Sequence, residues 1–448
     1  MKRICNAGLF ACGFLLLIQS KDIVFSRKYS YKRRNFATKS RYPDAEEKTT
    51  SIPKECRPKF INMVLRHGTR YPGEKDVIGM NKLEDFINQF HVNSTIQHNL
   101  TSWRNRFLNG HKLLAATGAQ ELYNISKRIR RWLPSLFSPK YNGEEHMFVS
   151  TMTARTSQSA SAFAFGLFEG TGNLGPSMFQ PVAITTTNLT EPQLRFFDNC
   201  LKYQLKVSKN KKISLAEYNK FRDGQEILDL KRKLGFKLNI PDNISITTDH
   251  IEHMFLSCAF EVAIYGKGKW CSIFDDSDLD VIEYMYDLKN YWKRGYGFEI
   301  NYQMSCLLLK NITESIENAI RSSGKTKAIF QFAHSETLIP LLCLMGLNKD
   351  SEPLLANNYH KQKNRLFRTS IIAPFSANIA IILYSCQFDM ADSFHVQVLV
   401  NENVTPLPCC DGLDLCPLKE FRACFQAITN SCDYNRICDM DKPSHNDL

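Results

Sequence analysis

The sequence predicts an α/β fold, in which a mostly parallel sheet is flanked by helices and interrupted by an inserted α-helical cap. Two parts of the chain, residues 53–185 and 291–405, alternate short apolar runs with helical patterns, which is typical of strands connected by helices. Residues 186–290 between them carry helical patterns and charged linkers but no clear pair of strands. We therefore expect the two outer parts to form one α/β domain and the middle part to form the cap.

The N-terminal stretch, residues 1–20, has the pattern of a secretory signal peptide. Lys2 and Arg3 precede an apolar run over residues 8–18, which is too short to cross a bilayer. An uncleaved anchor is the alternative interpretation. Residues 21–52 are polar and basic, and we expect them to form a flexible arm. No later run has transmembrane length, so we expect no stable membrane span after signal cleavage.

Glycosylation sequons and cysteines also indicate the secretory pathway. Seven Asn-x-Ser/Thr sequons are dense for a chain that never meets the glycosylation machinery. Thirteen of the fifteen cysteines lie beyond residue 20, so we expect disulfides and at least one thiol outside the intrachain pairs. The predicted glycosylation sites are Asn93, Asn99, Asn124, Asn188, Asn243, Asn311 and Asn403.

The C-terminal stretch, residues 406–448, is a cysteine-rich tail. Its six cysteines do not follow the spacing of a zinc site, so we expect disulfides rather than a metal. Residues 445–448 resemble the endoplasmic-reticulum retrieval tetrapeptide, although Asp447 stands where glutamate is usual; an ordinary chain end is the alternative. We expect the endoplasmic-reticulum lumen or secretion, with the retrieval receptor as a partner in the first case.

The net charge of +12 does not indicate a nucleic-acid partner. The signal segment contributes +2, residues 21–56 contribute +5, and the remaining body is only mildly basic at +5. Any preference for anions must therefore come from the local placement of cations rather than from bulk charge.

The first chemically informative junction follows the apolar run at residues 60–65. Arg66, His67 and Arg70 leave the end of this predicted strand together at a glycine turn. In an open α/β sheet, ligands bind beyond the carboxyl ends of the strands. Arginine forks match phosphate oxygens, and a histidine among them is suited to covalent or proton chemistry.

Two further junctions carry polar side chains. Arg155 follows the predicted strand at 147–150 in the first turn of a helix, where a cation opposes the helix dipole unless an anion compensates. His334 and Glu336 follow the predicted strand at 327–332. Taken singly, Arg155 fits a solvent-facing residue, His334 a core histidine and Glu336 a carboxylate favouring the dipole. We expect all three to have functions because the three strands would end at one edge of one sheet.

Together these groups predict phosphoryl transfer. The arginines would neutralise a phosphoryl group, and a neutral imidazole would attack phosphorus to form a phosphohistidine. A carboxylic acid would protonate the departing alcohol and, as a carboxylate, activate water for the second step. Because arginines supply the positive charge, we expect no metal and no other cofactor.

These motifs resemble those of the histidine acid phosphatases. Residues 66–72 match the RHGxRxP signature, and residues 334–336 resemble the proton-donor variant of the members that act on inositol polyphosphates. Residues 291–297 and the retrieval-like end are similar to the same members. The resemblance extends over about residues 38–400, with Ser335 in place of the usual alanine.

The resemblance implies the histidine phosphatase fold and a set of residue roles. His67 matches the nucleophile and Glu336 the proton donor. The implied substrates are phytate and lower inositol phosphates, with the 3-phosphate of 2,3-bisphosphoglycerate as a further one. The predicted substrate-binding residues are Arg66, Arg70, Arg155 and His334 around the scissile phosphate, and Lys293 and Arg294 for peripheral phosphates.

Two other functions stay open. A broad-specificity secreted or lysosomal acid phosphatase would share the nucleophile loop, although the glutamate donor and the lysine–arginine turn favour polyphosphates. A non-catalytic anion-binding relative would keep the arginines but lose His67 or the donor, and both are present.

Overall fold

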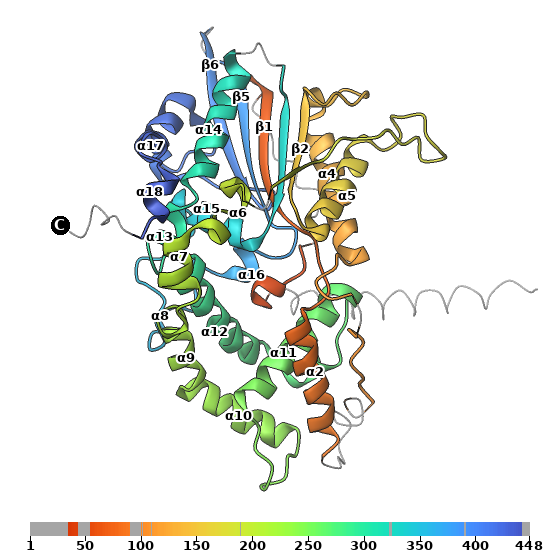
Figure 1. Ribbon diagram of the computed structural model, residues 1–448, viewed down its shortest axis with the longest axis vertical. Helices are drawn as coiled ribbons and strands as arrows, with labels where there is room; N and C mark the ends of the chain where they lie inside the picture. The colour runs from red at the N-terminus through yellow and green to blue at the C-terminus, as the bar shows by residue number, and fades with distance from the viewer. Residues whose placement is uncertain are drawn as a thin grey trace, which may run out of the picture.

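The computed structural model describes residues 35–43, 54–89, 100, 102–108, 110–188, 190–321, 325–388 and 391–440 (Figure 1). The predicted signal peptide, most of the predicted arm, the sequons at Asn93 and Asn99, and the terminal tetrapeptide lie outside these residues. Of the sequons inside them, Asn311 is half-buried and the others are exposed, and glycosylation stays a prediction.

A single mixed sheet forms the centre of the α/β part, in the order β3-β2-β4-β1-β5-β6-β7, with β8 paired to β6. The strands from β3 to β1 are mutually parallel, whereas β5 and the strands beyond it run antiparallel. The predicted α/β class is thus confirmed, with an antiparallel half that the sequence did not specify. The strands are β1 (Cys56–Arg66), β2 (His146–Thr151), β3 (Thr185–Thr187), β4 (Ala328–Ala333), β5 (Asn378–Phe388), β6 (Ala391–Val400), β7 (Asn403–Val404) and β8 (Cys416–Pro417).

The central strand β1 is buried on both faces, which explains its nearly continuous apolar sequence. Ile61, Met63 and Leu65 pack on the side of α4 (Ala116–Trp132) and α5 (Ala154–Phe168). Phe60 and Val64 point to the opposite core. This second core includes residues of α14 (Cys306–Arg321) and α15 (Ser335–Leu344).

A helical lobe extends from one end of the sheet (Figure 1). Most of it comes from the segment predicted as the cap, but α2 (Glu74–Ile87) joins it from the first part of the chain and packs on α11. Gly79 of α2 permits this approach, because a Cβ there would meet the ring of His253. The lobe's other helices are α7 (Leu201–Tyr203), α8 (Lys211–Ser214), α9 (Ala216–Arg222), α10 (Gln225–Lys237), α11 (Thr248–Tyr265) and α12 (Asp276–Arg294).

The remaining helices of the described residues are mostly short. Among all helices in the part of the chain that the structure describes, none is both long and apolar enough to cross a membrane. These remaining helices are η1 (Ala37–Lys39), η2 (Pro134–Leu136), α6 (Pro192–Asn199), η3 (Gln204–Ser208), η4 (Trp270–Ile273), α13 (Ile300–Gln303), α16 (Thr369–Ile372), η5 (Pro408–Cys410), α17 (Leu418–Asn430) and α18 (Tyr434–Cys438).

Part of the predicted flexible arm is packed into the molecule, so the expectation of an arm is wrong for residues 35–43. Phe36 and Thr38 are buried around η1. The carbonyl oxygen of Thr38 accepts a hydrogen bond of 2.7 Å from Arg66 Nη1. An aromatic residue and a backbone acceptor for a buried guanidinium therefore order this polar segment.

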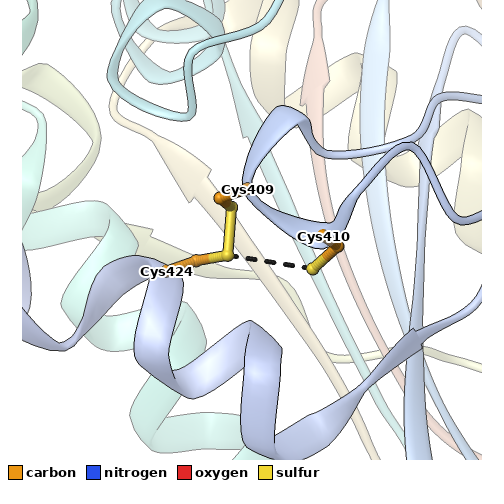
Figure 2. A group of neighbouring side chains, drawn as sticks. All are labelled: Cys409, Cys410 and Cys424. Atoms are coloured by element: carbon orange, nitrogen blue, oxygen red, sulfur yellow. Dashed lines mark hydrogen bonds between the residues drawn. A yellow bond between two sulfur atoms is a disulfide. The ribbon is translucent and has the colours of Figure 1, made fainter.

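Six disulfides lie within the described residues, and Cys343 is a buried free thiol. In the tail, the sulfurs of Cys409, Cys410 and Cys424 lie within 4.8 Å of one another (Figure 2). Each of the three is already part of a disulfide and offers no thiolate to a metal. The disulfide pairs are Cys56–Cys386, Cys200–Cys438, Cys258–Cys271, Cys306–Cys432, Cys409–Cys424 and Cys410–Cys416.

Candidate active site

Three parallel strands end at the same edge of the sheet and carry the predicted side chains to it. β4 lies between β1 and β2, so its carboxyl end is flanked by theirs. His67 follows β1, Arg155 lies in the first turn of α5 beyond β2, and His334 follows β4. The rings of His67 and His334 are 5.7 Å apart between centroids, and Arg155 Nη2 lies 3.2 Å from His334 Nδ1. Residues from three distant parts of the sequence thus form one cluster.

His67 is held as a neutral imidazole. Its Nδ1 lies 2.9 Å from the carbonyl oxygen of Gly68, and because a carbonyl only accepts hydrogen bonds, Nδ1 carries the proton. The lone pair then resides on Nε2. Burial, followed by the charge of Arg66, lowers the pKa of His67 well below its ordinary 6.5. The imidazole is therefore neutral at physiological pH, the form that can attack phosphorus.

The loop that carries His67 is locked against α4. A Cβ at Gly68 would lie 2.3 Å from the carbonyl oxygen of Gly118, so this approach of loop and helix requires glycine. The buried carboxylate of Glu121 accepts hydrogen bonds from the backbone N–H and the hydroxyl of Thr69, at 2.9 and 2.8 Å, and from Ser376 Oγ at 2.7 Å. These contacts fix the backbone on the C-terminal side of His67.

Arg66 is 2% exposed and donates hydrogen bonds to two backbone carbonyl oxygens. Its Nη1 donates to the carbonyl oxygens of Thr38 and Ala373 at 2.7 and 2.8 Å, and its guanidinium carbon lies 4.5 Å from the centre of the Phe375 ring. Burial and the neighbouring Arg70 charge lower the pKa of Arg66 to about 9. The guanidinium is charged at neutral pH, and a neighbouring anion would stabilise that charge.

His334 lies between two guanidinium groups. Arg155 Nη2 approaches its Nδ1 at 3.2 Å, and Arg195 Nη1 approaches its Nε2 at 3.3 Å. A neutral imidazole has one acceptor nitrogen and one N–H, so it cannot accept a hydrogen bond from both arginines. Burial and the Arg155 charge lower the pKa of His334 to about 3, which keeps the ring neutral. Thr151 Oγ1 also lies 3.1 Å from Nε2 and can accept its N–H, with Nδ1 accepting from Arg155. Arg195 Nη1 then has no acceptor on the ring, and an oxyanion would supply one.

Arg195 is a site residue that the sequence analysis missed. It lies in α6, in the segment predicted as the cap, at a break in the helix where φ is −126° and ψ is 35°. The same guanidinium forms an ion pair with Asp198. The only sequence signal for it is an arginine between the apolar neighbours Leu194 and Phe196, which no motif distinguishes.

Glu336 is bound at both carboxylate oxygens. Arg294 Nη2 lies 2.8 Å from Oε1, and the Ser335 hydroxyl donates to Oε2 at 2.8 Å. Burial works to raise the pKa of Glu336, but the Arg294 charge and the Ser335 hydrogen bond favour the carboxylate, and the pKa is held well below 4.5. The carboxyl group is therefore ionised in this structure.

Further cations surround this cluster. Burial, then the charges of Arg70 and Arg66, lower the pKa of Lys39 to about 7. Burial, then the charges of Arg294 and Lys289, lower the pKa of Lys293 to about 8. Lys39 comes from the segment predicted to be a flexible arm and is not among the predicted site residues.

The cluster as a whole is rich in hydrogen-bond donors. The Nε atoms of Arg66, Arg155 and Arg294 are buried and have no hydrogen-bond partner among the described residues. Unpartnered buried donors are costly, and a multiply charged oxyanion would satisfy them. Arginine and lysine do not coordinate metal ions, so this set of side chains is suited to an anion.

The comparisons with known proteins agree with this geometry. The family model of the histidine phosphatase superfamily (branch 2) matches residues 59–401. Multiple inositol polyphosphate phosphatase 1 of Homo sapiens is 31% identical, covering 95% of this chain and 92% of the relative. The Gallus gallus protein of the same name is 32% identical, covering 91% and 93%. The crystal structure of a Bifidobacterium longum multiple inositol polyphosphate phosphatase superposes with a TM-score of 0.69 at 18% identity, covering 88% of this chain and 98% of that one.

Proposed function

The chain belongs to branch 2 of the histidine phosphatase superfamily, and we propose that it removes phosphates from inositol polyphosphates, namely phytate and lower inositol phosphates. The relatives at 31% and 32% identity over nearly the whole chain carry this activity in their names. The Bifidobacterium longum neighbour was crystallised with inositol hexasulfate, which carries six anionic ester groups on an inositol ring, as phytate does.

One observation carries the proposal. The buried, neutral His67 has its lone pair on Nε2 and lies within the electrostatic influence of Arg66, Arg155 and Arg70, while Arg155 and Arg195 flank the neighbouring His334. Such a set of charges stabilises the oxygens of a transferring phosphoryl group, and the imidazole supplies the attacking lone pair. We assign Arg66, Arg70, Arg155, His334 and Arg195 to the scissile phosphate.

The reaction proceeds in two steps. Nε2 of His67 attacks phosphorus as the ester P–O bond breaks, and protonated Glu336 gives its proton to the leaving oxygen. The products of this step are a free alcohol, a phosphohistidine and the Glu336 carboxylate. The carboxylate then takes a proton from water, whose oxygen attacks phosphorus, and the P–N bond breaks. Inorganic phosphate, free His67 and the protonated donor result.

The preference for polyphosphates resides in the outer cations. Lys39, Lys293 and Arg294 lie around the inner cluster and act on it electrostatically. We assign them to phosphates next to the scissile one. A monophosphate ester would offer these cations no second phosphate to bind. The 2,3-bisphosphoglycerate activity implied by the family resemblance stays a prediction.

The disulfides indicate the kind of cellular compartment in which the protein resides. Six of them within the described residues fit an oxidising environment. Together with the signal-like N-terminus and the sequons, they support residence in the endoplasmic-reticulum lumen or secretion. The terminal tetrapeptide supports binding to a retrieval receptor as the route to lumenal residence.

A paired assay tests the function. Phosphate release is measured from phytate and from 4-nitrophenyl phosphate with wild type, His67→Ala and the exposed-histidine control His111→Ala. We expect wild type and His111→Ala to prefer phytate in kcat/KM. We expect His67→Ala to lose at least about a thousandfold in kcat on both substrates, because the nucleophile is absent.

Each alternative predicts a different result. Equal kcat/KM on the two substrates would favour a broad-specificity acid phosphatase. Activity unchanged in His67→Ala, with unaltered thermal unfolding, would refute the phosphohistidine mechanism. Binding of phytate without phosphate release by wild type would identify a non-catalytic relative.

A further inference from the structure

The proton donor and an arginine of the helical lobe are paired in a way that conflicts with the first chemical step. Protonation of the leaving oxygen requires Glu336 to carry a proton. With Arg294 on one oxygen and Ser335 on the other, the carboxyl group is held as an anion. Acid catalysis therefore requires this contact to break before the ester bond does.

Arg294 is placed so that a phosphate can take it from Glu336. It is the last residue of α12, and it is about one-fifth exposed at the side chain. Its Nη1 donates to Asn290 Oδ1 at 2.6 Å, while its Nε is buried without a hydrogen-bond partner. Lys293 precedes Arg294 in the chain. The charge of Arg294 lowers the pKa of both Lys293 and Lys39, so cations lie around it. A second phosphate of a bound substrate would offer several acceptors where Glu336 offers one.

We propose that Arg294 is a gate on the proton donor: it holds Glu336 as a carboxylate in the empty enzyme and releases it when a second substrate phosphate binds Arg294. The proposal rests on the proposed polyphosphate function and adds a role for a positioning residue. After release, Glu336 takes up a proton from solvent beside the anionic substrate. It then transfers that proton to the ester oxygen as described above.

This gate makes a monophosphate ester a poor substrate in kcat as well as in KM. Such an ester fills the inner cluster but leaves Arg294 on Glu336. The defect concerns alkyl esters, whose leaving oxygen needs a proton. An aryl phosphate with a good leaving group needs little acid catalysis and is insensitive to the gate.

The test compares wild type with Arg294→Gln on glycerol 2-phosphate, 4-nitrophenyl phosphate and phytate over a range of pH. Glutamine keeps a donor for Asn290 Oδ1 but removes the positive charge that Arg294 places beside Glu336. A rise of one unit in the pKa of Glu336 gives about ten times more protonated donor at neutral pH. We therefore expect kcat on glycerol 2-phosphate to rise about tenfold there. The alkaline limb of its pH profile should move to higher pH. We expect kcat on 4-nitrophenyl phosphate to stay within about twofold of wild type. The higher kcat on phytate than on glycerol 2-phosphate should disappear.

Two variants separate the gate from simple phosphate binding. Lys212→Gln removes a cation from an exposed position of α8 in the same lobe, outside the groups assigned to the substrate, so the pH profile on glycerol 2-phosphate should match wild type. Arg294→Lys keeps a cation and should restore most of the wild-type profile.

Two outcomes would overturn the gate. One is a higher KM for phytate in Arg294→Gln with an unchanged glycerol 2-phosphate profile, since Arg294 would then only bind phosphate. The other is an equal loss of kcat on all three substrates. Wild type that releases no phosphate from phytate would refute the proposed function instead, while the glycerol 2-phosphate profiles would still test the gate.

Discussion

At the scale of the residue, Arg195 shows how one side chain completes a site that no motif marks. Its guanidinium reaches His334 from α6, opposite Arg155. Its contact to Asp198 orients it, and its guanidinium carbon lies 5.8 Å from the centre of the Phe197 ring. Because the neutral His334 ring cannot accept from both arginines, the phosphoryl oxygens become the natural acceptors for them.

We expect Arg195→Ala to lower kcat/KM for phytate by about ten- to a hundredfold, since a hydrogen bond to a charged group contributes about 1.5–3 kcal/mol. Steady-state kinetics and inhibition by inorganic phosphate measure the effect, and the inhibition constant should rise as well. The control is Lys206→Ala, an exposed lysine of η3, which should leave both quantities unchanged. An inhibition constant equal to that of wild type would show that Arg195 does not contact the phosphate.

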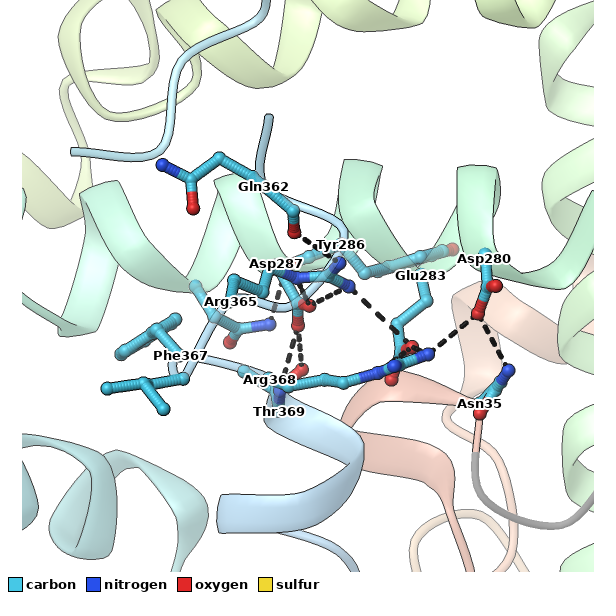
Figure 3. Close-up of polar contacts among 12 residues, drawn as sticks. Asn35, Asp280, Glu283, Tyr286, Asp287, Gln362, Arg365, Phe367, Arg368 and Thr369 are labelled. Carbon is cyan, nitrogen blue, oxygen red and sulfur yellow. Dashed lines mark hydrogen bonds and ion pairs between the residues drawn. The ribbon is translucent and has the colours of Figure 1, made fainter. Parts of the chain in front are cut away.

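At the scale of the element, α12 connects a buried ionic network to the active site. Midway along the helix, Asp287 accepts two hydrogen bonds from Arg365, at 2.8 and 2.6 Å (Figure 3). Glu283 accepts a bond of 2.7 Å from Arg368. These contacts hold α12 to the segment that leads into α16, and Arg294 lies at the end of the same helix. The network therefore sets where the proposed gate is placed.

Within this network, burial and then the Asp287 charge raise the pKa of Glu283 to about 7. The folded protein thus binds this proton more tightly than the unfolded chain, whose glutamate titrates near 4.5. The free energy of unfolding should fall as pH rises from about 4.5 to about 7. In Glu283→Gln this component, on the order of 3 kcal/mol, should vanish and leave a flatter pH dependence.

Chemical denaturation of wild type and Glu283→Gln across this pH range, with disulfides intact, measures the difference in slope. The exposed Glu314→Gln on α14 is the control and should follow wild type. A slope in Glu283→Gln equal to that of wild type would mean that Glu283 is ionised in the folded protein throughout the range.

At the scale of the whole molecule, the cysteine-rich tail packs against α6, the helix that carries Arg195. The disulfide Cys200–Cys438 joins α18 to the end of α6, the helix that carries Arg195. The hydroxyl of Tyr434 donates to the carbonyl oxygen of Phe196 at 2.7 Å. The tail is therefore packed against the elements that form the site.

Replacing both Cys200 and Cys438 by serine should lower the free energy of unfolding by about 2–5 kcal/mol, because the two residues are 238 positions apart and the reduced unfolded chain gains more freedom. The same change at Cys410 and Cys416, only 6 positions apart, is the control and should cost less. Thermal or denaturant unfolding measures both, and equal losses would argue against the chain-entropy explanation.

The sequence by itself determined the α/β class and the three polar junctions after apolar strands. These features are local: a buried strand needs a continuous apolar run, and a glycine turn after it is visible in a few residues. The placement of His67, Arg155 and His334 at one edge followed from the rule for parallel strands. Their catalytic roles stay predictions until the variants are measured.

Only the tertiary structure decided which partners these residues meet. β4 lies between β1 and β2, which places His334 between Arg155 and Arg195. The pairing of Arg294 with Glu336 and the burial of Lys39 join segments far apart in the chain. Such contacts depend on how helices and strands pack against one another, and neither hydrophobic periodicity nor a short motif encodes that packing.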